Sequence, residues 1–189
     1  MSATSVQKLA RVLKVLVTIT FVCNLIALVL VPGLTMLRGI QRLFLILPEE
    51  KGGDLAVQIV VFFLRCWKWV WLAGPHDVVL ALFLLFCGVC TAVILWQARR
   101  VLGTILRADT FSMANASNMG RAGICCFLIS LGALIRLVWG MVHYETIRVL
   151  FTYNALFIPI FFMGGLLCLV MSALFRQAAE LKAENDLTI

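Results

Sequence analysis

Two cysteines form the most chemically suggestive motif of the sequence, the C-x-x-C pair Cys87 and Cys90. A membrane thiol oxidoreductase would need such a pair near a quinone and near the outer membrane surface. Both cysteines instead lie in the middle of a long uncharged apolar run, where lipid disfavours the charged thiolate on which thiol exchange depends. The motif therefore indicates packing by small hydrophobic side chains, and a thiol oxidoreductase is the less favoured interpretation.

The two histidines, His76 and His143, lie at the predicted ends of membrane spans. Without a neighbouring cluster of carboxylates or thiols they do not make a metal site. The sequence also lacks a Ser-His-Asp arrangement, a phosphate-binding loop and a paired-carboxylate motif. We therefore expect no catalytic residues, no metal and no cofactor, and we do not expect an enzyme.

Arg136 is the only charged residue well inside a predicted span, and charged groups at such a depth tend to be functional. It lies about four residues from the span's centre, roughly 6 Å at helical rise, so it can also snorkel to the headgroups or bond Tyr153 or Asn154. Asn24 is the one strongly polar residue of the first apolar run. Asn24, Arg136 and Asn154 are thus the candidate intramembrane polar residues of a small transporter or a lipid- or small-molecule-binding protein.

A polar connector, residues 99–121, separates two apolar runs and carries four of the 16 basic residues, namely Arg99, Arg100, Arg107 and Arg121. Thr110, Phe111 and Ser112 can end one helix and cap the next, because a Ser or Thr side chain accepts the free N–H groups of the following turn. Phe111 would then anchor the connector at the membrane surface. These seven residues are candidates for an interaction surface.

The polar tail, residues 176–189, ends in an acidic segment. Arg176 and Glu180 are spaced i,i+4, as are Glu180 and Glu184, and Asp186 follows. We hypothesise that the acidic residues Glu180, Glu184 and Asp186 dock on the basic connector. The alternative is two solvated faces without contact, since exposed ion pairs contribute only about 0–1 kcal/mol.

The composition identifies the elements that must position these residues. The chain is 63% hydrophobic and 13% charged with a mean hydropathy of +1.06, whereas a soluble domain has about 25% charged residues. We predict an all-α integral membrane protein forming one domain, with four transmembrane helices plus an outer interfacial amphipathic helix. The net charge of +7 is divided among short membrane-flanking segments, which argues against direct nucleic-acid binding.

The predicted spans cover residues of about 12–33, 78–98, 122–142 and 149–175. The charged start and apolar run of the first span also fit a cleaved signal peptide, but no A-x-A-like site follows. The fourth span exceeds the ~30 Å hydrocarbon core at ~1.5 Å per residue. We therefore expect it to tilt, or to kink at Pro159.

The predicted outer loop, residues 34–77, contains a second apolar stretch at residues 55–73. Its polar residues fall on one narrow helical stripe, and Trp67, Trp69 and Trp71 gather at its end like an interfacial belt. We interpret this stretch as an interfacial helix; a fifth span or a strand is the alternative.

An even number of spans puts the basic N-terminal arm, the connector and the tail on the same side of the membrane. Short basic segments face the cytoplasm. We therefore expect a multi-pass protein of the bacterial cytoplasmic (plasma) membrane with both termini cytoplasmic. A fifth span would place the arm and the connector on opposite sides, contrary to this rule.

Two stretches, Thr110 to Gly123 and Phe175 to Ile189, resemble the bacterial membrane family called domain of unknown function 2975, the YoaS-like proteins. That family usually has P-F-S where this chain has Thr110-Phe111-Ser112, and it ends in L-T-V where this chain ends in Leu187-Thr188-Ile189. The resemblance implies a four-helix membrane protein with cytoplasmic ends and no established activity. It also implies frequent coding beside a small helix-turn-helix transcriptional regulator.

These observations predict a regulatory or scaffolding membrane protein of unknown biochemical activity. Its connector and acidic tail would present a cytoplasmic surface to a partner, for which the helix-turn-helix regulator is the candidate. The lipid bilayer is the other expected partner, and the sequence leaves homo-oligomerisation open. A small transporter or a lipid- or small-molecule-binding protein is the alternative function.

Overall fold

A computed structural model describes residues 5–36, 57–58, 60–61, 64, 67–68, 75–107, 109–144 and 153–187. These residues form four long α-helices: α1 (Ser5–Met36), α4 (Pro75–Leu106), α5 (Met113–Tyr144) and α6 (Tyr153–Leu187). All four are long and apolar enough to cross a membrane. The predicted all-α membrane fold with four transmembrane helices is therefore confirmed. The predicted interfacial helix at 55–73 lies mostly outside the described residues.

Each helix extends past the lipid-spanning run from which it was predicted. α1 starts before the predicted span and continues through Pro32 to Met36. α4 continues to Leu106, α5 begins at Met113, and the tail is helical to Leu187. The connector is therefore mostly helix, with only a short link at residues 107–112. α6 runs as one helix through Pro159, and residues 149–152 of the predicted fourth span lie outside the described part.

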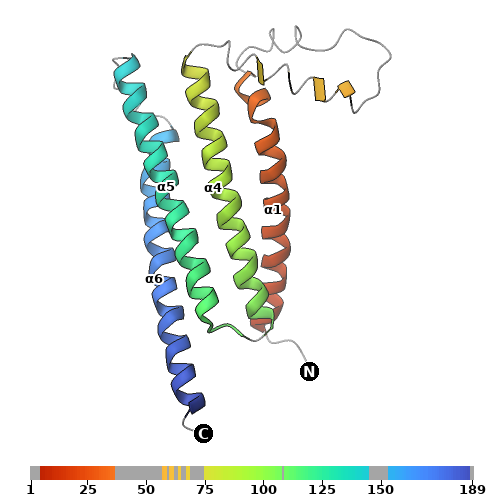
Figure 1. Cartoon of the computed structure of the whole chain (residues 1–189), viewed down its shortest axis with the longest axis vertical. Helices are drawn as coiled ribbons and strands as arrows, with labels where there is room; N and C mark the ends of the chain where they lie inside the picture. Colours follow the sequence, from red (N-terminus) through yellow and green to blue (C-terminus); the bar gives the residue numbers. More distant parts are fainter. Residues whose placement is uncertain are drawn as a thin grey trace.

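The four helices form an open antiparallel layer in the order α1, α4, α5, α6 (Figure 1). Among the described residues, each helix contacts only its neighbours in this order. The start of α1, the α4–α5 link and the end of α6 therefore lie at one end of the layer, which we call the connector end (Figure 1). Three segments that are far apart in the sequence meet there.

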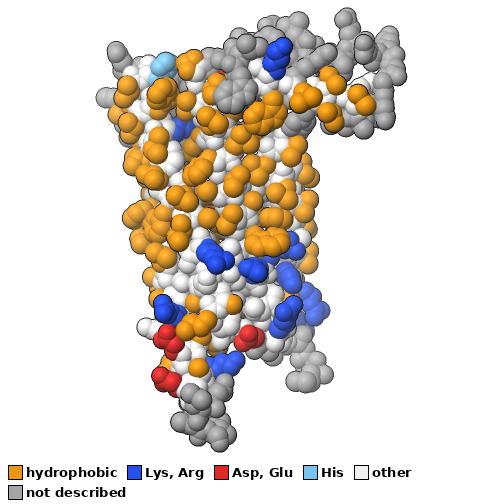
Figure 2. Space-filling model, in the orientation of Figure 1, with side chains coloured by type: hydrophobic (Ala, Val, Ile, Leu, Met, Phe, Trp, Pro, Cys, Tyr) orange, Lys and Arg blue, Asp and Glu red, His pale blue; other side chains and the backbone are white. Residues whose placement is uncertain are grey.

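The outer surface of the layer is apolar over most of its height. None of the most apolar 18-residue stretch of α1 is buried, and only 33% of the corresponding stretch of α5 is buried. Figure 2 shows hydrophobic side chains covering the visible face, with most of its Lys and Arg gathered toward the connector end. Lipid tails rather than water must cover such a surface, because a soluble monomer rarely exposes large contiguous apolar patches.

Small residues bring α5 and α6 into close contact, as is usual between transmembrane helices. A Cβ atom built on Gly165 would lie 3.1 Å from the Phe127 ring and 3.2 Å from the Gly123 carbonyl oxygen. The Ser130 hydroxyl donates a hydrogen bond to the Ile158 carbonyl, with 3.0 Å between the oxygens. The helix pair is thus joined by backbone proximity and by an interhelical hydrogen bond.

We expect Gly165→Ala to lower the free energy of unfolding by about 1–3 kcal/mol, because the added methyl group meets a backbone oxygen that cannot move aside. Gly164→Ala is the matched control, since a Cβ at Gly164 meets nothing within 4 Å. Thermal unfolding of both variants in detergent measures the difference. Equal stabilities would show that the α5–α6 contact is not this tight.

Candidate functional site

The link between α4 and α5 is ordered by backbone hydrogen bonds. The N–H groups of Arg107 and Asp109 donate to the Thr104 carbonyl at 3.0 and 3.1 Å, and the Asn115 N–H donates to the Ser112 carbonyl at 3.0 Å. Ser112 precedes the first residue of α5, which is the predicted capping position. Its buried Oγ makes no hydrogen bond within the described part of the chain, so the predicted side-chain cap is not formed.

Asn115, rather than a Ser112 cap, stabilises the link between α4 and α5. It is completely buried, and its Nδ2 donates to the Thr110 carbonyl at 2.8 Å. Its Oδ1 accepts from the Thr104 hydroxyl at 2.9 Å; that hydroxyl also lies 2.7 Å from the Val101 carbonyl. A buried amide satisfied at both ends fixes the end of α4 relative to the start of α5. Sequence analysis missed this residue, although an Asn in a first helical turn is a recognised signal of such local bonding.

The tail contacts the connector through a lysine of the tail and an aspartate of the connector. Lys182 Nζ lies 3.4 Å from the Asp109 carboxylate, and both side chains are about half exposed. Phe111 and Phe175 place their ring centroids 6.4 Å apart. Glu180 pairs with Arg176 on its own helix at 3.2 Å, as the i,i+4 spacing predicts. The docking of the acidic tail residues on the connector arginines stays a prediction, because the side chain of Asp186 lies outside the described part of the chain.

A groove opens beside this link at the connector end. One face of α4 forms its floor, while α1 and α5 form its walls, and its volume is ≈630 Å³. The groove is lined by Lys14, Trp96, Arg99, Arg100, Gly103, Thr104, Arg107, Ala114, Ser117, Asn118 and Arg121. Gly103 deepens the floor because it has no side chain. We call this feature the connector groove.

The connector groove concentrates positive charge. Five of its lining residues are cationic and none is acidic: Lys14, Arg99, Arg100, Arg107 and Arg121. Two nearby carboxylates pair with cations outside this lining, Asp109 with Lys182 and Glu180 with Arg176. Like charges at such proximity repel one another. The groove is therefore suited to an anion that neutralises them.

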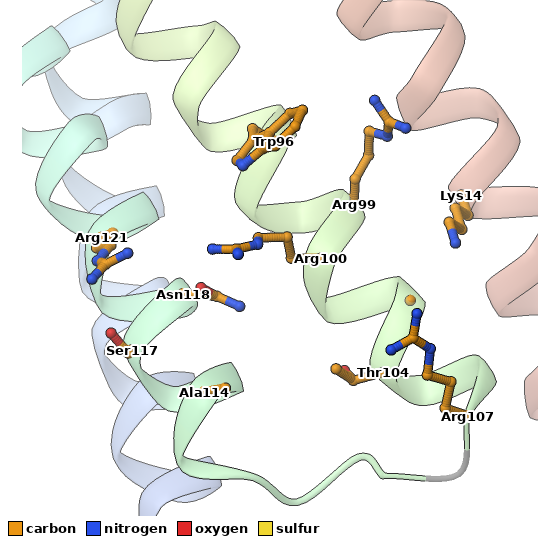
Figure 3. Close-up of a pocket in the computed structure, with 11 residues that line it drawn as sticks. Lys14, Trp96, Arg99, Arg100, Thr104, Arg107, Ala114, Ser117, Asn118 and Arg121 are labelled. Atoms are coloured by element: carbon orange, nitrogen blue, oxygen red, sulfur yellow. The ribbon is translucent and has the colours of Figure 1, made fainter.

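The groove side chains come from three helices. Figure 3 shows Arg100 extending from α4 toward α5, where Asn118 and Arg121 lie, with Lys14 on α1 at the opposite wall. The Arg99 guanidinium lies 5.7 Å from the ring centroids of both Phe21 and Trp96, a cation–π geometry that holds it at the membrane side of the groove. Sequence analysis named the four connector arginines but missed Lys14, Trp96 and Asn118.

Two of the predicted intramembrane polar residues, Asn24 and Arg136, lie on helices that do not contact each other. Arg136 on α5 lies over the Phe83 ring at 4.8 Å, in an apolar groove of ≈410 Å³ between α4 and α5. Asn24 is on α1, which does not contact α5, and its Oδ1 is buried without a partner in the described structure. Asn154 is in the first turn of α6, and its side chain lies outside the described part.

The cysteines in the described helices are all free. Cys90 of α4 makes a thiol hydrogen bond with Cys125 of α5, and Cys126 makes one with Cys168 of α6. They thus occupy helix–helix contacts, as expected for small packing residues. No group of potential metal ligands exists among the described residues.

Four membrane-spanning helices with a short link define a multi-pass membrane protein. Residues 68–189 match the family model described as "Protein of unknown function (DUF2975)", and the chain belongs to this family. The match covers α4, α5, α6, the connector and the tail, while α1 with Lys14 lies before it. No curated protein and no solved structure matches the chain.

We expect Asn115→Ala to cost about 1–3 kcal/mol of stability, because it removes the hydrogen bonds of a completely buried amide and leaves the part-buried Thr110 carbonyl without its donor. Asn118→Ala is the control: Asn118 is on the same helix and only 7% exposed, but it makes no hydrogen bond within the described structure. Thermal unfolding in detergent compares the two variants. A larger loss for Asn118→Ala would contradict the assigned role of Asn115.

Proposed function

We propose that this protein is a non-enzymatic regulatory membrane protein that binds a phosphate-bearing anion in the connector groove. The observation that supports this function is the gathering of five cationic side chains around one groove that contains no carboxylate. Charge-assisted hydrogen bonds from arginine are the strongest that proteins make to phosphate oxygens. Four arginines and one lysine supply a large excess of such donors.

We further propose that the connector end faces the cytoplasm. The N-terminal turns of α1 carry Lys8, Arg11 and Lys14, and they lie at the same end as the connector arginines and the tail (Figure 1). Short segments rich in Lys and Arg remain in the cytoplasm during membrane insertion. The groove would then face the leaflet and the solution that contain the cell's phosphorylated compounds.

The connector joins the proposed anion site to the tail. Thr104 lines the groove and bonds Asn115, which in turn holds Thr110. The next residue toward the N-terminus, Asp109, contacts Lys182 on the tail. A ligand that draws α4 and α5 together would alter these contacts. We therefore propose that ligand binding is transmitted to the tail.

Binding of a phosphate compound is the direct test. We expect pyrophosphate or an anionic phospholipid to raise the unfolding temperature of the purified protein. Arg100→Gln with Arg121→Gln should reduce this effect, since each cation near a membrane surface contributes about 1 kcal/mol of attraction.

Arg176→Gln with Lys182→Gln is the matched control, because it removes two positive charges from the same end but outside the groove. The proposal fails if neither type of compound stabilises the protein. It also fails if the control variant loses the effect as fully as the groove variant does.

A second function, docking of a partner protein on the tail, is favoured by the exposed acidic face of α6. Glu180 and Glu184 are exposed, and α6 reaches beyond the connector link (Figure 1). A basic partner, such as the helix-turn-helix regulator, fits this face. We expect Glu180→Gln with Glu184→Gln to abolish binding of the purified regulator in a pull-down, while Gln177→Ala leaves it unchanged; equal binding by both variants would exclude this role.

A further inference from the structure

We infer that the ligand of the connector groove is the headgroup of an anionic phospholipid that enters from the adjacent leaflet. This inference rests on the proposed anion binding and names the class of ligand. Soluble phosphates and nucleotides are the competing sources of the same chemistry. The depth, the lining and the size of the groove distinguish between them.

The depth of the groove matches the boundary between hydrocarbon and headgroups. Residues 78–98 of α4 carry no charge, and the cationic residues begin at Arg99. The groove extends along α4 from Trp96 to Arg107, about 16 Å at helical rise. Because the interfacial layer on each side of a bilayer is only about 5–8 Å thick, a groove that starts at the hydrocarbon edge passes through the level of the lipid phosphates.

The lining changes from aromatic to cationic along the same direction. Trp96, at the membrane side, is 49% exposed, and tryptophan prefers the membrane interface. The next helical turn presents Arg99 and Arg100, and the link presents Arg107. A phospholipid has the same order of parts, since its acyl chains join the headgroup at the interface. A soluble anion would contact only the cationic part of this lining.

The size of the groove exceeds what a single small anion needs. Its volume of ≈630 Å³ corresponds to roughly twenty waters at their share of liquid volume. Five cations also exceed the single charge of one phosphodiester. Both facts favour a headgroup with more than one negative charge, that is, two phosphodiesters or a phosphodiester with a phosphomonoester. Basic pockets between transmembrane helices on the cytoplasmic side bind lipids of this kind.

Asn118 places an uncharged polar side chain among the cations of the groove. It is only 7% exposed and lines the groove between Arg100 and Arg121 (Figure 3). An amide offers both donors and an acceptor, so it suits the hydroxyl and phosphate oxygens of a glycerol-based headgroup.

The test uses the full chain, delipidated in detergent and then placed in nanodiscs of phosphatidylcholine alone or with added cardiolipin. Native mass spectrometry counts the cardiolipin molecules that stay bound, and a titration gives their affinity. We expect one tightly retained cardiolipin per chain. Arg100→Gln with Arg121→Gln should weaken its binding roughly 30-fold, because each cation contributes about a factor of five.

Two further variants distinguish a specific binding site from general electrostatic attraction between cardiolipin and surface cations. Asn118→Leu keeps every charge and should still weaken cardiolipin binding, whereas Arg176→Gln with Lys182→Gln removes two charges outside the groove and should change the affinity less than about fivefold. Equal losses in the groove variant and in this second double variant would overturn the inference.

A titration with soluble anions distinguishes this inference from the proposed function. Delipidated protein is titrated with pyrophosphate and with ATP, and we expect each to bind far more weakly than cardiolipin. Tight binding of either one that depends on Arg100 and Arg121, without retention of cardiolipin, would overturn the lipid inference and leave the proposed function standing. If neither lipid nor soluble anions bind, both are wrong.

Discussion

An excess of positive charge at one end of the helix layer is the constraint on which the rest of this structure depends. Each end of a membrane protein must meet water and headgroups, and here the connector end carries nearly all of the described cations. Two nearby carboxylates, Glu180 and Asp109, pair with Arg176 and Lys182, and the lining of the groove contains none. The five cations of the groove therefore favour an anion from outside the protein.

The open arrangement of the helices places these cations around one groove. Because α1 and α5 each contact α4 but not one another, the exposed face of α4 between them becomes the floor of a groove. Gly103 leaves room on that floor. The buried amide of Asn115 fixes the angle at which α4 leads into α5, so the arginines of both helices face the same space. A closed four-helix bundle would have covered this face of α4.

The sequence predicts the helices well but not the pairings between them. In lipid, the backbone polar groups of a long uncharged run can be satisfied only within a spanning helix, so hydropathy predicted the four helices that the described residues form. The helices are longer than the predicted spans, because helices continue into the headgroup layer, where polar residues are tolerated. The connector arginines were identified as an interaction surface, yet Lys14 could not be linked to them, since that requires the register of α1 against α4. The contact between Asp109 and Lys182 was not predicted, because each residue has the charge opposite to the net charge of its segment.

The sidedness of the connector end tests the central claim most directly, because the charge excess should both orient the protein and select its ligand. A fluorescent protein that matures only in the cytoplasm and a phosphatase that folds only in the periplasm can each be fused after Ile189 and expressed in a bacterial host. The account predicts fluorescence from the first fusion and no phosphatase activity from the second. Phosphatase activity without fluorescence would place the groove on the outer side and contradict the account.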